Sequence, residues 1–225
     1  RATVSTVKNG VIKRISSSND YFLGGLYRYI TLLLGMKPNE HEYKVMGLAP
    51  YAKEKYYQRA LKIFQKTQQV KGLSFAYKTK PPDLYFYFRD KLEGERFDSN
   101  AGALQKYTEN MLVSWADNAI KKTGFRDLCL AGGSAMNVKV NMEINSLKSV
   151  KEFFICPSPS DESQAIGAAY VLMSDYCRNH KLDADKVLRP LSSAYLGPDI
   201  TNQEILELIK KEELQKKYKI IRKVD

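Results

Sequence analysis

The stretch LCLAGGSAMNVKVN at Leu128–Asn141, followed by PSPSDESQAIGAA at Pro157–Ala169, decides the fold class of this chain. The two blocks combine short apolar runs, loops of small or polar residues, and helical patterns. Strands that alternate with helices in this way predict βαβ units and a mostly parallel sheet. The predicted elements are a buried strand at Asp127–Ala131, a turn at Gly132-Gly133, a helix at Ala135–Leu147, a second strand at Glu152–Cys156, a loop at Pro157–Glu162 and a helix at Ser163–Arg178.

Both loops follow the carboxyl ends of predicted strands, where open α/β sheets bind their ligands. The Gly132-Gly133 step has no Cβ to hold phosphate oxygens away, and the N-terminus of the next helix attracts anions. Ser134 and Asn137 add polar groups near that end. Asp161 in the second loop offers a carboxylate, which is a hard oxygen ligand for a cation. Two plainer interpretations remain open: the glycines serve only the turn, and Asp161 only caps a helix.

The remaining sequence predicts further elements but carries less chemistry. Asn9-Gly10 between two strand-like runs predicts a β-hairpin, and Gly24-Gly25 marks either a close approach to a neighbouring group or the start of a helix. A 3.6-residue period from Asn100, closed by Gly124, predicts one long helix. The other predicted elements are hairpin strands at Ala2–Val7 and Val11–Ser16, a helix at Tyr21–Leu34 capped within Ser17–Asp20, a surface helix at Glu54–Gln68, strands at Leu73–Tyr77 and Leu84–Phe88, and a capped helix at Thr201–Lys217.

Composition excludes several classes of protein. The chain has 225 residues, 44 % of them hydrophobic, which is enough apolar material for a sizeable core. Its apolar runs all fall well short of the roughly 18 residues that a membrane helix needs. Three cysteines without CxxC spacing fit the reducing cytoplasm, and His41 and His180 are too isolated to build a zinc cluster. We therefore expect a cytoplasmic globular protein that does not span a membrane.

The formal net charge of +11 resides in the N-terminal part, since residues 1–92 hold 17 basic and 6 acidic side chains. Such a field attracts nucleic acid or phosphorylated molecules, and tyrosines interleave with the lysines there. A solvated basic surface is the commoner explanation, so nucleic acid is not the partner we expect.

Three blocks carry a resemblance to the NodU/CmcH carbamoyltransferases, in the order in which that family has them. They are GLYRYITLLLGMKPNEHEYKVMGLAPYA at Gly25–Ala52 and the two blocks quoted above; YLGP at Tyr195–Pro198 resembles the end of the family's main domain. The resemblance implies a ribonuclease-H-like half of an ASKHA (actin-like ATPase) domain, with a mixed sheet flanked by helices. Residues 1–181 would belong to that domain, and 182–225 would lead toward a YrdC-like domain.

The resemblance also implies a reaction. Members of the family are ATP-dependent O-carbamoyltransferases that make carbamoyl adenylate from carbamoyl phosphate and ATP, and then transfer the carbamoyl group to a hydroxylated small molecule or oligosaccharide. By position, Gly132, Gly133 and Asn137 would approach the adenylate, with Ser134 beside them. Lys44 and Gly47 would border the ribose or acceptor, although core packing explains their block equally well. Asp161 would be the carboxylate beside a divalent metal, Fe or Mg.

Two parts of the family pattern have no counterpart in these 225 residues. They are an upstream pair of metal-binding histidines and the YrdC-like domain, so we expect a fragment that binds nucleotide weakly at most and is inactive alone. Two alternatives stay open: a tRNA-modifying or kinase relative of the same fold, and an RNA-binding or scaffold module that uses the basic N-terminal half. The sequence leaves the acceptor, the metal and the oligomeric state undetermined.

Overall fold

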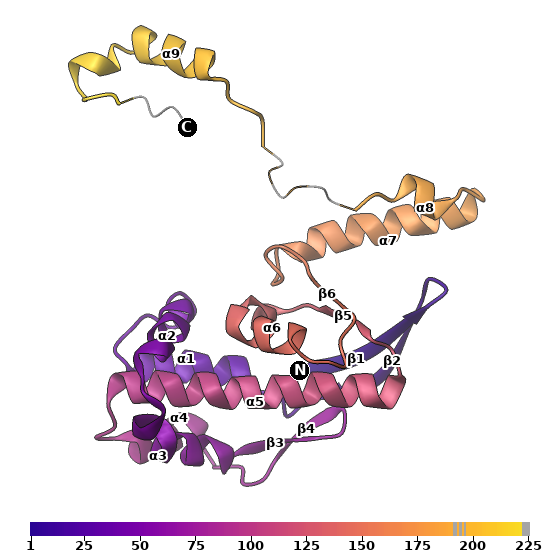
Figure 1. Ribbon diagram of the computed structural model, residues 1–225. Coiled ribbons are helices and arrows are strands. Elements are labelled where there is room, and N and C mark those ends of the chain that lie inside the picture. Colours follow the sequence, from indigo (N-terminus) through magenta and orange to yellow (C-terminus); the bar gives the residue numbers. More distant parts are fainter. Residues whose placement is uncertain (191–192, 194, 196, 222–225) are drawn as a thin grey trace. The chain divides into compact units, whose positions relative to one another are not determined.

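A computed structural model of the chain describes residues 1–190, 193, 195 and 197–221 (Figure 1). The chain is a mixed α/β protein that divides into two compact units, Arg1–Leu172 and Met173–Asp225. The division expected after residue 181 concerns the longer family domain and stays a prediction, and the block at Tyr195–Pro198 falls partly outside the described residues. Among the described helices, none is long and apolar enough to cross a membrane.

The first unit opens with the predicted β-hairpin. Strands β1 (Ala2–Lys8) and β2 (Val11–Ser18) pair in antiparallel fashion. Asn9 and Gly10 connect them with φ of 52° and 73°, which are the two positive values that a type I′ turn requires. At its base, the Ser18 hydroxyl donates to Phe75 O and accepts from Phe75 N at 2.9 and 3.0 Å, and this ties the hairpin to β4 (Ser74–Tyr77).

Helix α1 (Leu23–Leu33) starts two residues later than Tyr21 and includes Gly24-Gly25 in its first turn. The predicted cap within Ser17–Asp20 is wrong, because Phe22 occupies the N-cap position and no side chain bonds to the first N–H groups. Those groups are left available to a neighbour. Helix α2 (Glu42–Leu48) and the short 3-10 helix η1 (Ala49–Tyr51) follow.

The core forms around helix α5 (Phe97–Thr123), which begins three residues before the predicted Asn100 and ends, as predicted, at Gly124 with φ of 75°. Figure 1 shows α5 between α6 on one side and β3 (Gln68–Lys71) with β4 on the other. Helix α3 (Glu54–Gln65) packs along α5 as well and ends before the predicted Gln68. The ring centroid of its fully buried Phe64 lies 4.8 Å from the ring centroid of Phe88 and 5.8 Å from that of Tyr107.

The strand predicted at Leu84–Phe88 is wrong, because helix α4 (Leu84–Leu92) occupies that region. Asp83 caps it by accepting a 2.9 Å bond from Phe86 N. Phe88 and Leu92, which lie four residues apart and therefore on one helix face, are the buried pair. Aromatic residues are common in strands, which favoured the strand prediction. The Asp83 cap and the burial of two residues four positions apart stabilise a helix instead.

The C-terminal half of the first unit has the predicted strand–loop–helix order. Strands β5 (Asp127–Leu130) and β6 (Glu152–Ile155) pair in parallel, joined through the 3-10 helix η2 (Gly133–Met136) and helix α6 (Val138–Asn145). This parallel pair confirms the parallel arrangement that the alternation of strands and helices predicted for this segment, although the described residues form three separate two-stranded sheets, two of them antiparallel. The prediction of a buried β5 is wrong, because Cys129 is exposed.

Helix α7 (Ser163–Asn179) follows β6 and continues into the second unit. The second unit also contains α8 (Ala184–Val187), α9 (Asn202–Lys211) and the 3-10 helix η3 (Leu214–Lys216). Helix α9 starts with the predicted capping box, in which Thr201 and Glu204 bond reciprocally. It ends six residues before the predicted Lys217.

Candidate functional site

The two loops that the sequence singled out line one cavity of about 780 Å³ in the first unit. The start of α1, residues in and before α2, and Thr108 of α5 supply its other walls. The cavity residues that matter for chemistry are Gly24, Gly25, Tyr27 and Arg28 from α1, Glu40, Glu42, Tyr43 and Met46 from α2 and its approach, Gly133, Ser134 and Asn137 after β5, and Ser160 and Asp161 after β6.

The loops after β5 and β6 touch each other, as their positions at the carboxyl ends of parallel strands predicted. Gly132 N donates to Pro159 O at 2.7 Å, and a Cβ added to Gly133 would lie 3.7 Å from Ser160 Oγ. Gly132 has φ of 99° and ψ of 164°, a conformation that is essentially restricted to glycine. Gly132 therefore serves the turn, whereas Gly133 faces the cavity.

Ser134 is held by a partly buried tyrosine that precedes α1. The Tyr21 hydroxyl donates to Ser134 Oγ, and the Tyr21 ring packs edge-on against Phe75 with 4.8 Å between centroids. Burial raises the pKa of Tyr21 to about 12, although the bond to Ser134 partly opposes that shift. Tyr21 is therefore a neutral hydroxyl donor at physiological pH.

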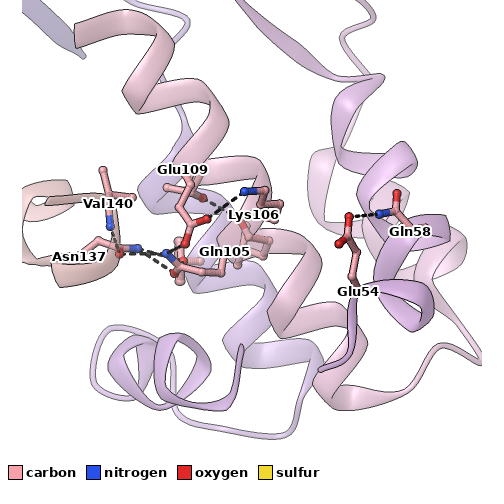
Figure 2. A network of polar contacts seen from close by, with 10 residues as sticks. Glu54, Gln58, Gln105, Lys106, Glu109, Asn137 and Val140 are labelled. Carbon is pink, nitrogen blue, oxygen red and sulfur yellow. Dashed lines mark hydrogen bonds and ion pairs between the residues drawn. The ribbon is translucent and has the colours of Figure 1, made fainter. Parts of the chain in front are cut away.

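The side chain of Asn137 is fully engaged in hydrogen bonds within the protein (Figure 2). Its Oδ1 accepts from Val140 N, which caps α6, and from Gln105 Nε2, both at 3.1 Å. Its Nδ2 donates to Gln105 Oε1 at 3.0 Å and to the Tyr27 hydroxyl at 3.1 Å. Asn137 is only 8 % exposed and its amide fixes the loop, so its contact with the adenylate stays a prediction.

Gln105 extends this network into α5. Its Nε2 also donates to Glu109 Oε1 at 2.9 Å, and Glu109 pairs with Lys106 at 3.7 Å. The Tyr27 hydroxyl donates to Gln105 Oε1, and burial raises the Tyr27 pKa, so that this donor also stays neutral. Gln105 was not among the predicted site residues, although a glutamine at a buried position of an amphipathic helix is a signal for a buried hydrogen-bond network.

The start of α1 is a further part of the site. The sequence marked Gly24-Gly25 as a close approach or a helix start but gave it no role in ligand binding. Gly24 and Gly25 line the cavity, and the helix ladder begins only with Leu26 N bonding to Phe22 O. The N-terminal N–H groups and positive dipole end of an eleven-residue helix thus lie at the cavity. Arg28, one turn further on, is the only basic side chain among the described residues that line it.

Asp161 lies at the cavity, as predicted, and its carboxylate is exposed. Its Oδ1 accepts a 3.0 Å bond from Gln164 Nε2. Within the described ranges, no group of three His, Cys, Asp or Glu side chains comes together as a metal site. Asp161 alone therefore supplies one ligand at most.

Lys44 and Gly47 are not among the residues that line the cavity. Their helix, α2, presents Tyr43 and Met46 there, whereas Lys44 is exposed with its Nζ 5.8 Å from the Tyr43 ring centroid. One residue along a helix turns the side chain by about 100°, so neighbours of the lining positions point elsewhere. The role suggested for Lys44 and Gly47 stays a prediction.

Comparison with known proteins gives a consistent set of similarities. Residues 3–170 match the family model described as Carbamoyltransferase N-terminus. An uncharacterized protein of Synechocystis is 32 % identical over 87 % of this chain and 34 % of its own length. Nodulation protein NolO of Bradyrhizobium diazoefficiens is 29 % identical over 74 % of this chain and 30 % of its own, and nodulation protein U of the same organism is 27 % identical over 51 % and 20 %. The chain thus spans at most about a third of the length of these relatives.

Proposed function

The chain belongs to the carbamoyltransferase family, whose N-terminal model it matches over residues 3–170, and we propose that it forms the nucleotide-facing part of an ATP-dependent O-carbamoyltransferase. The longer protein would transfer a carbamoyl group from carbamoyl adenylate to a hydroxyl group of an acceptor. The observation that carries this proposal is the single cavity that brings together Gly133, Ser134, Arg28 and the uncapped start of α1.

The cavity suits a nucleotide in size and in the hydrogen-bond donors and aromatic surface that part of its wall presents. Its volume of about 780 Å³ falls within the range of small-molecule sites, about 300–1,000 Å³. Helix N–H groups at Gly24-Gly25, the Arg28 guanidinium and the Cβ-free approach at Gly133 favour phosphate oxygens. Phe22, Tyr27 and Tyr43 add aromatic surface for a base or ribose.

Adenylation supplies a carbamoyl donor with a good leaving group. The oxygen of the acceptor hydroxyl attacks the carbamoyl carbon and its proton passes to solvent water, while the bond from that carbon to the adenylate oxygen breaks and AMP departs with the additional negative charge. Arg28 and the start of α1 would stabilise that charge, because fixed donors need no reorganisation when it forms. The cavity wall would also orient the phosphate so that the carbonyl faces the acceptor.

The described residues do not complete a metal site by themselves. Asp161 is the one predicted metal ligand, and the cavity also contains Glu40 and Glu42. Glu40 pairs with Lys37 at 2.5 Å, and Glu42 accepts from Asn39 N at 2.6 Å, so both carboxylates already have partners. A divalent metal, Fe or Mg, would need further ligands from the longer protein.

The same proposal includes the fold and setting of the longer protein. The β5–β6 pair, with its site loops at the carboxyl ends, would belong to a ribonuclease-H-like half of an ASKHA domain, and a YrdC-like domain would make the carbamoyl adenylate. Parallel strands rarely stand alone in pairs, which supports a larger sheet around β5 and β6. The reducing cytoplasm suits the three free cysteines.

The test is carbamoyl-phosphate-dependent release of AMP from ATP by the intact protein, compared with its Gly133→Val variant. Valine methyl groups at this position would fill the space between Gly133 and Ser160. We expect release by the wild type and a loss of at least tenfold in the variant. Equal rates in the two proteins, with the variant folded by circular dichroism, would place the reaction elsewhere.

RNA binding by the basic N-terminal half is the weaker candidate. Two of its exposed aromatic rings already lie beside cations of the same chain: Lys55 Nζ and the Arg96 guanidinium carbon lie 4.8 and 5.6 Å from the Tyr56 ring centroid. Arg89 covers Phe86 at 4.7 Å. Rings occupied in this way offer less stacking surface to unpaired bases.

A further inference from the structure

Two tyrosines that flank the start of α1 reach across to the two ends of one loop. Tyr21 bonds to Ser134 and Tyr27 bonds to Asn137, and these partners are the first and last polar side chains of the segment Gly133–Asn137. Each bond joins residues more than 100 positions apart in sequence. Phe22–Gly25, which lies between the two tyrosines, lines the same cavity as that loop.

We propose that Tyr21 and Tyr27 are positioning residues that hold the Gly133–Asn137 loop at a fixed distance from the start of α1, so that both walls engage one nucleotide. The proposal rests on the proposed function for the identity of the ligand. It assigns to these tyrosines no contact with the reacting atoms.

The hydroxyl groups are suited to this task because the rings are anchored independently of them. Tyr21 packs edge-on against Phe75, 4.8 Å between centroids, and both tyrosines pack against the buried core. A Tyr→Phe change therefore removes the hydroxyl and leaves the ring in place. Burial keeps both hydroxyls protonated over the whole neutral range. Tyr21 therefore donates to Ser134, whereas Tyr27 accepts from Asn137 and donates to Gln105.

The two bonds differ in how strongly each one restrains the loop. Asn137 Nδ2 donates to both the Tyr27 hydroxyl and Gln105 Oε1. If the Tyr27 hydroxyl is lost, the 3.0 Å bond to Gln105 Oε1 remains. No other bond to Ser134 Oγ is recorded among the described residues. Tyr21→Phe should therefore loosen the loop more than Tyr27→Phe does.

Tyr107 provides a matched control. Its hydroxyl is also buried and donates to a backbone oxygen, Gln68 O, at 3.2 Å, and its ring stacks on Phe64. Burial raises its pKa to about 12, as for Tyr21. Neither Tyr107 nor Gln68 lines the cavity, so Tyr107→Phe reports the cost of losing a buried hydroxyl without any effect on the loop.

The experiment measures two quantities in the intact protein and in the three Tyr→Phe variants: amide hydrogen exchange in Gly133–Asn137 and the dissociation constant for ATP. We expect faster exchange of the loop amides in Tyr21→Phe and Tyr27→Phe, and ATP binding about two- to tenfold weaker, which is the effect of one net hydrogen bond. Tyr107→Phe should lower the melting temperature and change neither quantity.

The two readouts separate the inference from the function on which it rests. If the wild type fails to bind ATP but the loop exchanges faster in Tyr21→Phe and Tyr27→Phe alone, the proposed nucleotide is wrong and the positioning of the loop stands. Unchanged loop exchange in both variants overturns the inference. So does an increase in Tyr107→Phe equal to theirs, because general destabilisation would then explain it.

Discussion

Asn137→Asp tests the buried network behind the site, because it replaces one NH2 group by oxygen at nearly constant size. The new side chain still accepts from Val140 N and Gln105 Nε2 but loses the two bonds that Asn137 Nδ2 donates. While the introduced carboxyl is protonated, its hydroxyl replaces one of them, and the expected loss in unfolding free energy is about 0.5–1.5 kcal/mol. Once it ionises, both bonds are lost and a charge is buried at a position 8 % exposed, so the loss exceeds about 2 kcal/mol.

The direction of the pH dependence follows from the surroundings of that carboxyl. Glu109 lies behind Gln105 and is only partly neutralised by Lys106, and the Tyr27 hydroxyl is neutral. Burial and the negative charge of Glu109 should both raise the pKa of the introduced carboxyl above its ordinary value of about 3.9. The folded variant then binds more protons than the unfolded chain, so its stability relative to wild type falls as pH rises from about 4.

Urea unfolding at pH 5 and pH 8 measures this difference. Gln58→Glu is the control, because Gln58 Nε2 donates a 2.9 Å bond to Glu54 Oε1 on the exposed surface (Figure 2). We expect the loss of unfolding free energy in Asn137→Asp, relative to wild type, to be larger at pH 8 than at pH 5 by at least about 1 kcal/mol. In the control, the loss should differ by only a few tenths of a kcal/mol between the two pH values. A deficit that is the same at both pH values would refute the buried network.

Three further predictions concern other parts of the chain. Phe64→Ala should lower the unfolding free energy by about 3–5 kcal/mol in urea titrations, because Phe64 is fully buried, whereas Phe86→Ala at a half-exposed position should cost under about 1 kcal/mol. Hydrogen bonds from Arg96 lower the pKa of Asp98, so this carboxylate stabilises the fold above pH about 3.9, and acid titration of Arg96→Gln should show a smaller loss of stability below that pH than the wild type does. RNA binding, if the basic half supports it, should weaken steeply with salt and be indifferent to Asp161→Ala, as filter binding at two salt concentrations would show.

Local patterns predicted the elements whose cause is local. The Asn9-Gly10 turn, the Gly124 cap and the Thr201–Glu204 capping box appear as predicted, because each depends on φ or on a side chain within a few residues. The alternation around β5 and β6 also predicted that their loops meet, since the carboxyl ends of parallel strands share one edge.

The rest of the site depends on contacts that no local pattern records. Tyr27 and Gln105 are 78 residues apart, and Gln105 and Asn137 are 32 apart, so their network exists only after α1, α5 and α6 have packed. The same packing places the Asn137 amide against Gln105 and Tyr27, where it stabilises the loop. Lys44 misses the cavity by one helical position, a rotation that block similarity cannot resolve.

The central claim, that the cavity holds the nucleotide by its phosphate groups, is tested most directly by ATP affinity in Arg28→Ala beside Arg14→Ala. Both variants lose one positive charge, but Arg28 lines the cavity, whereas Arg14 lies exposed on β2. Loss of a hydrogen bond to a charged group corresponds to at least about a tenfold weaker affinity, and we expect this in Arg28→Ala alone. An equal and small weakening in both variants would show that ATP responds only to the general positive field, and would contradict the site.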